Sequence, residues 1–159
     1  MTVKSRPSIY FAAPLFSDAE LSFNLRVTTQ HERYVDVYLP QRDGGKVVDL
    51  IARKVIIDDA YRSIFDRDME ALSDVDVLLI ILDGRSIDEG AAFELGVAHT
   101  LRKRCVGLQT DSRRLLPFGN NPMIVGALER IFSDLSELLM WVKSLTLLNR
   151  STTNRINTE

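Results

Sequence analysis

The 159-residue sequence has few of the residues that build disulfide or metal-bound scaffolds. It contains one cysteine, Cys105, and two histidines, His31 and His99. A single cysteine cannot form an internal disulfide or a cysteine-based zinc cluster, and chains without disulfides are typical of reducing compartments. The two histidines lack metal-ligand spacing, and we expect both on the surface. The sequence therefore predicts neither a metal site nor a disulfide framework.

Long apolar runs and a surplus of one charge sign are also absent. The first residues, MTVKSRPS, lack the apolar stretch of a signal peptide, and no run reaches transmembrane length. The net charge is −2, from 20 Lys+Arg and 22 Asp+Glu, which gives no argument for binding nucleic acid or an anionic membrane. The one basic triplet, 102–104, closes an expected helix and there opposes its dipole. We expect a cytoplasmic protein with neither nucleic acid nor membrane as partner.

Expected strands alternate with expected helices along the chain. The clearest strand is VDVLLIIL at 75–82, because a near-continuous run of Val, Ile and Leu is typical of a central parallel strand. The other expected strands are 8–12, 34–39, 105–109 and 130–132. The expected helices are 17–31, 46–73 in two pieces, 88–104, a short one after 121, and 134–148. This pattern predicts an α/β fold, flavodoxin-like and doubly wound, with a mainly parallel five-stranded sheet.

The chain has the length of one domain. We expect residues 1–150 to form it, and the tail STTNRINTE at 151–159, which has nothing to bury, to fray. In a parallel sheet ligands gather beyond the carboxyl ends of the strands. That rule brings the loops 12–17, 40–45 and 83–90 to one crevice.

Glu94 is the single charged residue within the apolar stretch AAFELGVA at 91–98. Burying a carboxylate is costly unless it has partners or a function. Gly90, one turn earlier, leaves open space toward the helix N-terminus, where the helix dipole favours an ionised carboxylate. Such a group could act as a nucleophile or hold a ligand. In the alternative, a buried arginine or backbone amides satisfy Glu94 and its role is structural.

Asp68 falls on the apolar side of another expected helix, where loss of water would raise its pKa. A protonated aspartate facing an ionised glutamate would form an acid and nucleophile pair. In the alternative, the helix is slightly rotated and Asp68 lies in water. The expected inward stripe consists of Tyr61, Ile64, Phe65, Asp68 and Leu72, and the expected outward face of Asp66, Glu70 and Ser73.

Three segments resemble the nucleoside 2-deoxyribosyltransferase family, which includes N-glycosidases acting on deoxynucleoside monophosphates. The most specific runs from RDMEALSDVDVLLIILDG through DEGAAFELG and contains Asp68 and Glu94. The opening IYFAAPLF resembles the family's first strand and loop, and NPM at 121–123 its Asn-x-Met element. The similarity covers about residues 8–125, most of the chain.

The resemblance implies roles for individual residues. Glu94 would attack the anomeric carbon, Asp68 would protonate the departing base and activate the incoming one, and Tyr10 would orient Glu94. Phe16 would pack against the sugar, and Asp88 would lie near its 5′ end. An anionic Asp88 would repel a 5′-phosphate, which favours free nucleosides. Otherwise Tyr10 and Phe16 are core aromatics, and Asp88 and Glu89 are charges at a helix N-terminus.

The remaining candidates concern the base and a neighbouring subunit. Gly90 would border the substrate, and Gln41 and Asp43, with Arg42, are candidates for recognising the base. Asn121 and Met123 match the element that completes the neighbouring subunit's site, which implies a homo-oligomer with shared active sites. Otherwise Asn121 is a turn residue before Pro122. The tail lacks the C-terminal aromatic with which some transferases reach their site.

The resemblance implies transfer of 2-deoxyribose between nucleobases of deoxynucleosides, a step in nucleotide salvage. It would proceed with retention through a covalent glycosyl-enzyme, without a cofactor or a metal, and its partners would be deoxynucleosides and free bases. Two alternatives stay open: a 2′-deoxynucleoside 5′-monophosphate N-glycosidase that hydrolyses its substrate, and a non-catalytic nucleoside-binding module.

Overall fold

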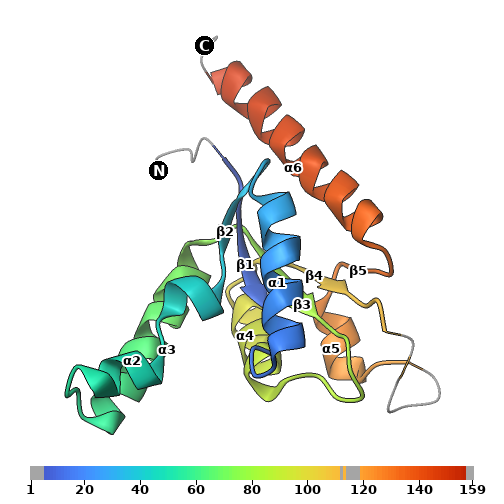
Figure 1. The fold of residues 1–159 in the computed structure, drawn as a ribbon. Coiled ribbons are helices and arrows are strands. Elements are labelled where there is room, and N and C mark those ends of the chain that lie inside the picture. The colour runs from blue at the N-terminus through green and yellow to red at the C-terminus, as the bar shows by residue number, and fades with distance from the viewer. Residues whose placement is uncertain (1–5, 112, 114–118, 157–159) are drawn as a thin grey trace.

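A five-stranded parallel sheet forms the centre of the structure, a computed structural model that describes residues 6–111, 113 and 119–156, with side chains up to 147 (Figure 1). The strand order is β2-β1-β3-β4-β5, and all four pairings are parallel. The strands are β1 Ser8–Ala12, β2 Asp36–Tyr38, β3 Val77–Ile81, β4 Arg104–Leu108 and β5 Arg130–Phe132. The predicted α/β sheet is confirmed.

Helices cover both faces of the sheet, as a doubly wound fold requires. Helices α1 and α6 pack on one face, while α3, α4 and α5 pack on the other (Figure 1). The helices are α1 Asp18–His31, α2 Val47–Ala52, α3 Ile57–Asp74, α4 Glu89–Thr100, α5 Pro122–Ala127 and α6 Leu135–Ile156. A single π-helical turn, η1 Pro40–Gly44, follows β2. The carboxyl ends of β1, β2 and β3 therefore open toward α3 and α4.

Several element ends differ from their predicted positions. Helix α4 ends at Thr100, and Arg102 has a φ of 58°, a left-handed conformation that stops a helix. The basic triplet thus follows the helix, and Lys103 Nζ donates to the Ser73 carbonyl, 2.5 Å away, at the end of α3. Helix α6 continues to Ile156, because the tail STTNRI contains no glycine or proline to end it. The expected frayed segment is therefore helical over 151–156, and 157–159 lie outside the described residues.

The predicted inward stripe of α3 is wrong in its first half. Tyr61 and Phe65 are 58% and 47% exposed, because α2 and the N-terminal half of α3 project away from the sheet (Figure 1). Leu72, near the other end of α3, is fully buried as predicted. Asp68 lies between these two regions and is half-buried. The predicted stripe does lie along one side of the helix, but only the C-terminal half of α3 packs against the sheet.

His31, predicted on the surface, is instead buried at 2% exposure, whereas His99 is exposed as predicted. Its Nδ1 lies 2.6 Å from the Val27 carbonyl, so Nδ1 carries the proton and donates it. Its Nε2 has no hydrogen-bond partner within the described part of the chain. Burial therefore lowers the pKa of His31, because a second proton would charge the ring in an apolar setting.

This burial predicts a pH-dependent contribution to stability. As pH falls through about 6.5, His31 becomes protonated in the unfolded chain but stays neutral in the folded chain, where its pKa is lower. The free energy of unfolding therefore falls by at most about 1.4 kcal/mol per pH unit. Urea unfolding at several pH values, compared between the protein and His31→Leu, isolates this contribution because all other groups are shared. The difference in free energy of unfolding between the two proteins should change with pH below 6.5 and be constant above it. His99→Gln should leave the slope unaltered, and equal slopes for His31→Leu and the parent would contradict the prediction.

Candidate functional site

Two carboxylates from different helices meet two tyrosines from adjacent strands. Tyr10 Oη donates to Glu94 Oε1 at 2.6 Å, and Tyr38 Oη donates to Asp68 Oδ1 at 2.8 Å. Tyr10 and Tyr38 are paired in register across β1 and β2, and their rings stack with centroids 5.3 Å apart. The structure thus brings Glu94, Asp68 and Tyr10 together on the face of the sheet that α3 and α4 cover. The alternative in which Asp68 faces bulk water does not hold.

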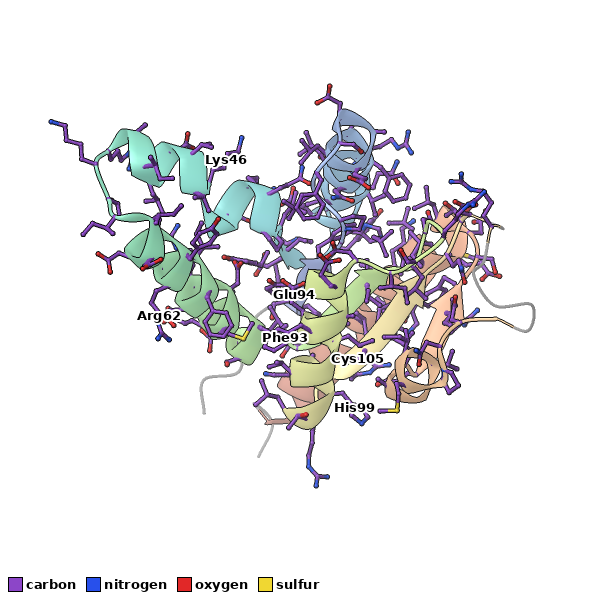
Figure 2. The ribbon with its side chains drawn as sticks, turned by 90° about the horizontal axis from the view of Figure 1, so that it is seen from below. Lys46, Arg62, Phe93, Glu94, His99 and Cys105 are labelled. Carbon is purple, nitrogen blue, oxygen red and sulfur yellow. The ribbon has the colours of Figure 1, made fainter. Side chains whose placement is uncertain are left out.

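Glu94 lies in the second turn of α4, with Phe93 beside it turned toward Phe65 of α3 (Figure 2). Burial, together with the charges of Asp68 and Asp88, raises the pKa of Glu94 to about 7, and the hydrogen bond from Tyr10 acts in the opposite direction. The N-terminal position on the helix therefore does not keep Glu94 fully ionised. Near neutral pH both protonation states are populated, which suits a group that must be ionised in one step of a cycle.

Asp68 also has a raised pKa, as the sequence predicted, and burial is the main cause. The Tyr38 hydroxyl and the positive charge of Arg67 both favour its ionised form and limit the rise. A carboxyl balanced in this way can give up a proton and take one back. The pair thus consists of two neighbouring carboxyls with raised pKa values, each hydrogen-bonded to one tyrosine.

Asp88 caps helix α4. Its Oδ1 accepts from the Ala91 amide at 2.8 Å, as the alternative of a helix-end charge predicted. A Cβ at Gly90 would lie 3.1 Å from that same oxygen, so the space beside Gly90 is bordered by the Asp88 carboxylate. Asp88 nonetheless adds negative charge near Glu94 and contributes to its raised pKa.

Phe16 lies at the opening of the β1–α1 loop and is 79% exposed. The alternative of a core aromatic is therefore wrong for Phe16. Tyr10, in contrast, is fully buried and also hydrogen-bonded to Glu94, so packing and the site share this residue.

The two candidates for base recognition are held by the protein itself. Gln41 accepts from Asn24 and donates to the Leu21 carbonyl, both at 3.0 Å, which fastens the loop after β2 to α1. Asp43 Oδ2 accepts from the Leu39 amide at 2.9 Å, and Asp43 also pairs with Arg42. The structure uses both side chains to shape the loop.

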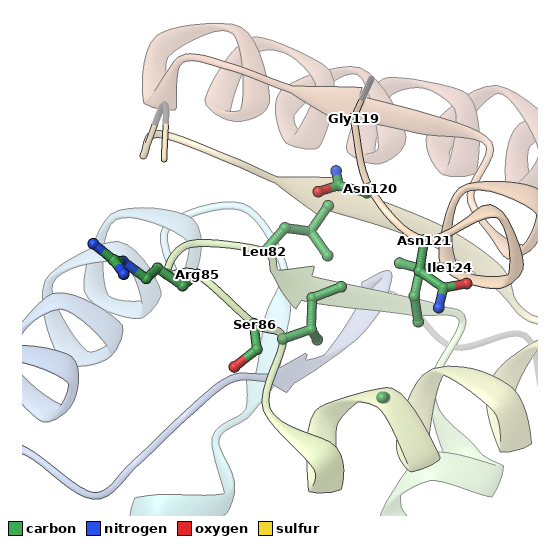
Figure 3. Close-up of a pocket in the computed structure, with 10 residues that line it drawn as sticks. Leu82, Arg85, Ser86, Gly119, Asn120, Asn121 and Ile124 are labelled. Atoms are coloured by element: carbon green, nitrogen blue, oxygen red, sulfur yellow. The ribbon is translucent and has the colours of Figure 1, made fainter. Parts of the chain in front are cut away.

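Asn121 and Met123 lie at the start of α5. Asn121 Oδ1 accepts from the Met123 amide at 2.9 Å, so Asn121 is a helix cap rather than a simple turn residue, and Met123 is 81% exposed. Asn121 borders a pocket of about 330 Å³ that also includes Ser86 and Ile124 (Figure 3). The lining of this pocket includes neither Glu94 nor Asp68. Within one chain, Asn121 and Met123 are therefore separate from the carboxylate pair.

Tyr38 was missed by sequence reasoning. The signal was present, because YVDVYL was expected to be a strand and Tyr38 follows its alternation. Only the register with β1, however, shows that Tyr38 stands beside Tyr10 on the same side of the sheet.

The sequence predicted neither a metal centre nor a membrane-spanning segment. Over 6–111, 113 and 119–156, no cluster of three or more His, Cys, Asp or Glu side chains could hold a metal ion. No helix in that part of the chain is long and apolar enough to cross a membrane.

Comparisons with known proteins agree with one another. The family model for nucleoside 2-deoxyribosyltransferase matches residues 9–147. A crystal structure of a conserved protein from Enterococcus faecalis V583 is 30% identical, covers 87% of this chain and 98% of its own, and has a TM-score of 0.71. A 2-deoxyribosyltransferase from Bacillus psychrosaccharolyticus is 22% identical over 83% of this chain and 90% of its own, with a TM-score of 0.64.

Two further solved structures share the fold. A 2-deoxyribosyltransferase from Leishmania mexicana is 18% identical over 87% of this chain and 97% of its own, with a TM-score of 0.63. A CMP N-glycosidase from Clostridium botulinum is 14% identical over 85% of this chain and 97% of its own, with a TM-score of 0.53. No curated protein sequence gives a significant match.

Proposed function

Because the chain belongs to the nucleoside 2-deoxyribosyltransferase family, we propose that it moves 2-deoxyribose between the nucleobases of deoxynucleosides through a covalent intermediate on Glu94. The observation that carries this proposal is the pair of half-buried carboxylates, Glu94 and Asp68, each bonded to its own tyrosine at the end of the sheet. Binding alone would not need two carboxylates with raised pKa values side by side.

In the first step, ionised Glu94 attacks the anomeric carbon as the bond to the base breaks. The transition state resembles an oxocarbenium ion, and a nearby carboxylate stabilises its positive charge before capturing the carbon. The base would be a poor anion, so proton donation from Asp68 accelerates its departure by a factor of about 10²–10⁴. Tyr10 keeps Glu94 oriented by its hydrogen bond.

In the second step, an incoming base gives a proton to Asp68 and displaces Glu94 from the sugar. Two displacements at one carbon retain its configuration. If water enters in place of a base, the same intermediate is hydrolysed. The balance between transfer and hydrolysis therefore depends on how well the crevice excludes water once the first base has left.

We propose free deoxynucleosides as the substrates, since the Asp88 carboxylate caps α4 next to Glu94 and would repel a 5′-phosphate. Exposed Phe16, at the opening of the β1–α1 loop, would cover the sugar. The side-chain amide of Gln41 and the carboxylate of Asp43 would contact the base with the donor and acceptor sites that their bonds within the loop leave over.

We also propose that the active form is a homo-oligomer. Asn121 and Met123 lie on the surface of the chain, and Met123 is a large apolar side chain that is 81% exposed. Contact with the crevice of a neighbouring copy would bury Met123 and supply an amide close to that copy's carboxylate pair.

Incubation of the protein with deoxyinosine and adenine tests the function. Transfer predicts that deoxyadenosine and hypoxanthine appear in equal amounts, separated by liquid chromatography. Hypoxanthine with free deoxyribose, whether or not adenine is present, would show a hydrolase. No product from deoxyinosine or from deoxyinosine monophosphate, with binding intact, would favour a binding module.

The raised pKa of Glu94 predicts the pH dependence of the reaction. A substrate such as 7-methyl-2′-deoxyguanosine releases a neutral base without needing an acid, so its kcat/KM, corrected for the substrate's own titration measured without protein, follows the ionisation of Glu94. Because burial moves that pKa to about 7, kcat/KM should rise with pH, with a midpoint near 7 and a plateau above it. A profile that is already flat above pH 5 would show that Glu94 ionisation does not limit the reaction.

A further inference from the structure

We propose that Tyr38 is a positioning residue for Asp68, and that the stacked pair of Tyr38 and Tyr10 sets the spacing between the two carboxylates. This inference rests on the proposed function, because it assigns to Tyr38 a part in the proton transfer to the leaving base. The resemblance to the family implies no role for Tyr38, but its contacts do.

The two tyrosines form one rigid unit. Tyr38 is the last residue of β2, and its Cα pairs with that of Tyr10 in β1. In-register residues of neighbouring parallel strands point to the same face, and here the rings stack with an angle of 21° between their planes. Each ring ends in a hydroxyl that donates to one carboxylate, at 2.6 Å to Glu94 and 2.8 Å to Asp68.

Packing holds α3 on one side of Asp68 only. Met69, Ala71 and Leu72 pack against the sheet, whereas the first half of the helix projects from it (Figure 1). Asp68 lies at the boundary between these regions, and its own side chain is half-buried. The Tyr38 hydroxyl, attached to a strand, gives that side chain a fixed hydrogen-bond partner.

The loop after β2 closes over this contact. A Cβ on Gly44 would lie 2.7 Å from Asp68 Oδ1 and 3.5 Å from the Tyr38 hydroxyl. The first distance is shorter than real contacts of this kind, so an alanine at position 44 would displace the Asp68 oxygen from the position in which it accepts from Tyr38. The absence of a side chain at Gly44 keeps the Tyr38–Asp68 hydrogen bond intact.

The same contact changes the pKa of Asp68. A hydroxyl that donates to a carboxylate stabilises the ionised form, and the Tyr38 hydrogen bond accordingly lowers the pKa of Asp68 against the effect of burial. Removing the hydroxyl should raise that pKa. Tyr10 acts in the same way on Glu94, so each tyrosine controls one member of the pair.

Two substrates separate the roles of the tyrosines. Tyr38→Phe should lower kcat on deoxyinosine roughly 10-fold, because its base needs the proton from Asp68, and should change kcat on 7-methyl-2′-deoxyguanosine less than about 2-fold. Gly44→Ala should reproduce this selective loss. Tyr10→Phe should slow both substrates, because both need Glu94. Tyr34→Phe, a tyrosine whose ring lies under Lys143 on the other face, is the matched control and should slow neither.

A titration without turnover provides the second measurement. Carbon-13 NMR of the Asp68 carboxyl should show a higher pKa in Tyr38→Phe than in the parent, and no such rise in Tyr34→Phe. Equal kcat losses on both substrates, or an Asp68 titration that Tyr38→Phe leaves unaltered, would overturn the inference. A parent protein inactive on both substrates would overturn the proposed function instead, and the titration would still decide whether Tyr38 controls Asp68.

Discussion

Glu94→Ala protein should form no covalent deoxyribosyl adduct. Intact mass spectrometry of the parent protein mixed with a deoxynucleoside should show a second peak, heavier by one deoxyribosyl group, because the proposed reaction passes through a glycosyl-enzyme. The proposed mechanism assigns the bond to the anomeric carbon to the Glu94 carboxylate and keeps Asp68 for proton transfer. We expect kcat to fall by about 10⁴-fold or more, as is usual when a covalent nucleophile is removed.

Two companion variants make this result specific. Glu94→Gln retains an oxygen that can accept from Tyr10, so the site keeps its hydrogen bond but loses the nucleophile, and it should be as inactive as Glu94→Ala. Glu89→Ala removes an exposed glutamate from the first turn of the same helix and should keep the adduct. An adduct that persists on Glu94→Ala protein would show that another residue is the nucleophile.

The order of strands and helices could be predicted because each element carries its own hydrophobic pattern. The run VDVLLIIL has the pattern of a covered central strand, and it forms β3. Ser17 and Glu20 have the spacing of a capping box, which the structure contains at the start of α1. Element ends were less predictable. Whether α6 stops at Leu148 or continues to Ile156 depends on small local free energies and not on a strong stop signal.

Burial was harder to predict than secondary structure, because it depends on what lies opposite a residue. His31 has the polarity of a surface residue, yet α1 turns its ring inward, where the Val27 carbonyl accepts from it. Tyr61 and Phe65 have the pattern of core residues, yet the sheet does not extend far enough to cover them. Both errors come from the tertiary position of a helix, which no local pattern contains.

For the site, the residues alone indicated two isolated carboxylates, and only the resemblance to the family implied Tyr10 as the partner of Glu94. Glu94 stood out because a single charge in an apolar helix needs an explanation, and the structure supplies Tyr10 as its hydrogen-bond donor. Tyr38 could not be found in this way, since a tyrosine in a strand is unremarkable until the register is known. Gln41 was a candidate for base recognition because of its amide, but only the structure shows that amide occupied by Asn24 and the Leu21 carbonyl.

Asp68→Asn should separate proton transfer from nucleophilic attack. The amide keeps an oxygen that can accept from Tyr38 but cannot donate an acidic proton, so we expect kcat/KM on deoxyinosine to fall by about 10²–10⁴-fold. On 7-methyl-2′-deoxyguanosine the fall should be less than about 10-fold, because that base leaves without protonation. Asp66→Asn, on the exposed side of the same helix, should lose little with either substrate.

The same variant should also move the pH profile, in a direction that follows from the electrostatics. The charge of Asp68 helps to raise the pKa of Glu94 to about 7, so its removal should let Glu94 ionise at lower pH. With 7-methyl-2′-deoxyguanosine, the rising limb of kcat/KM should therefore have a lower midpoint in Asp68→Asn than in the parent. A fall in rate that is equal for both substrates, with the midpoint unmoved, would mean that Asp68 supports the fold of the crevice but neither donates the proton nor interacts electrostatically with Glu94.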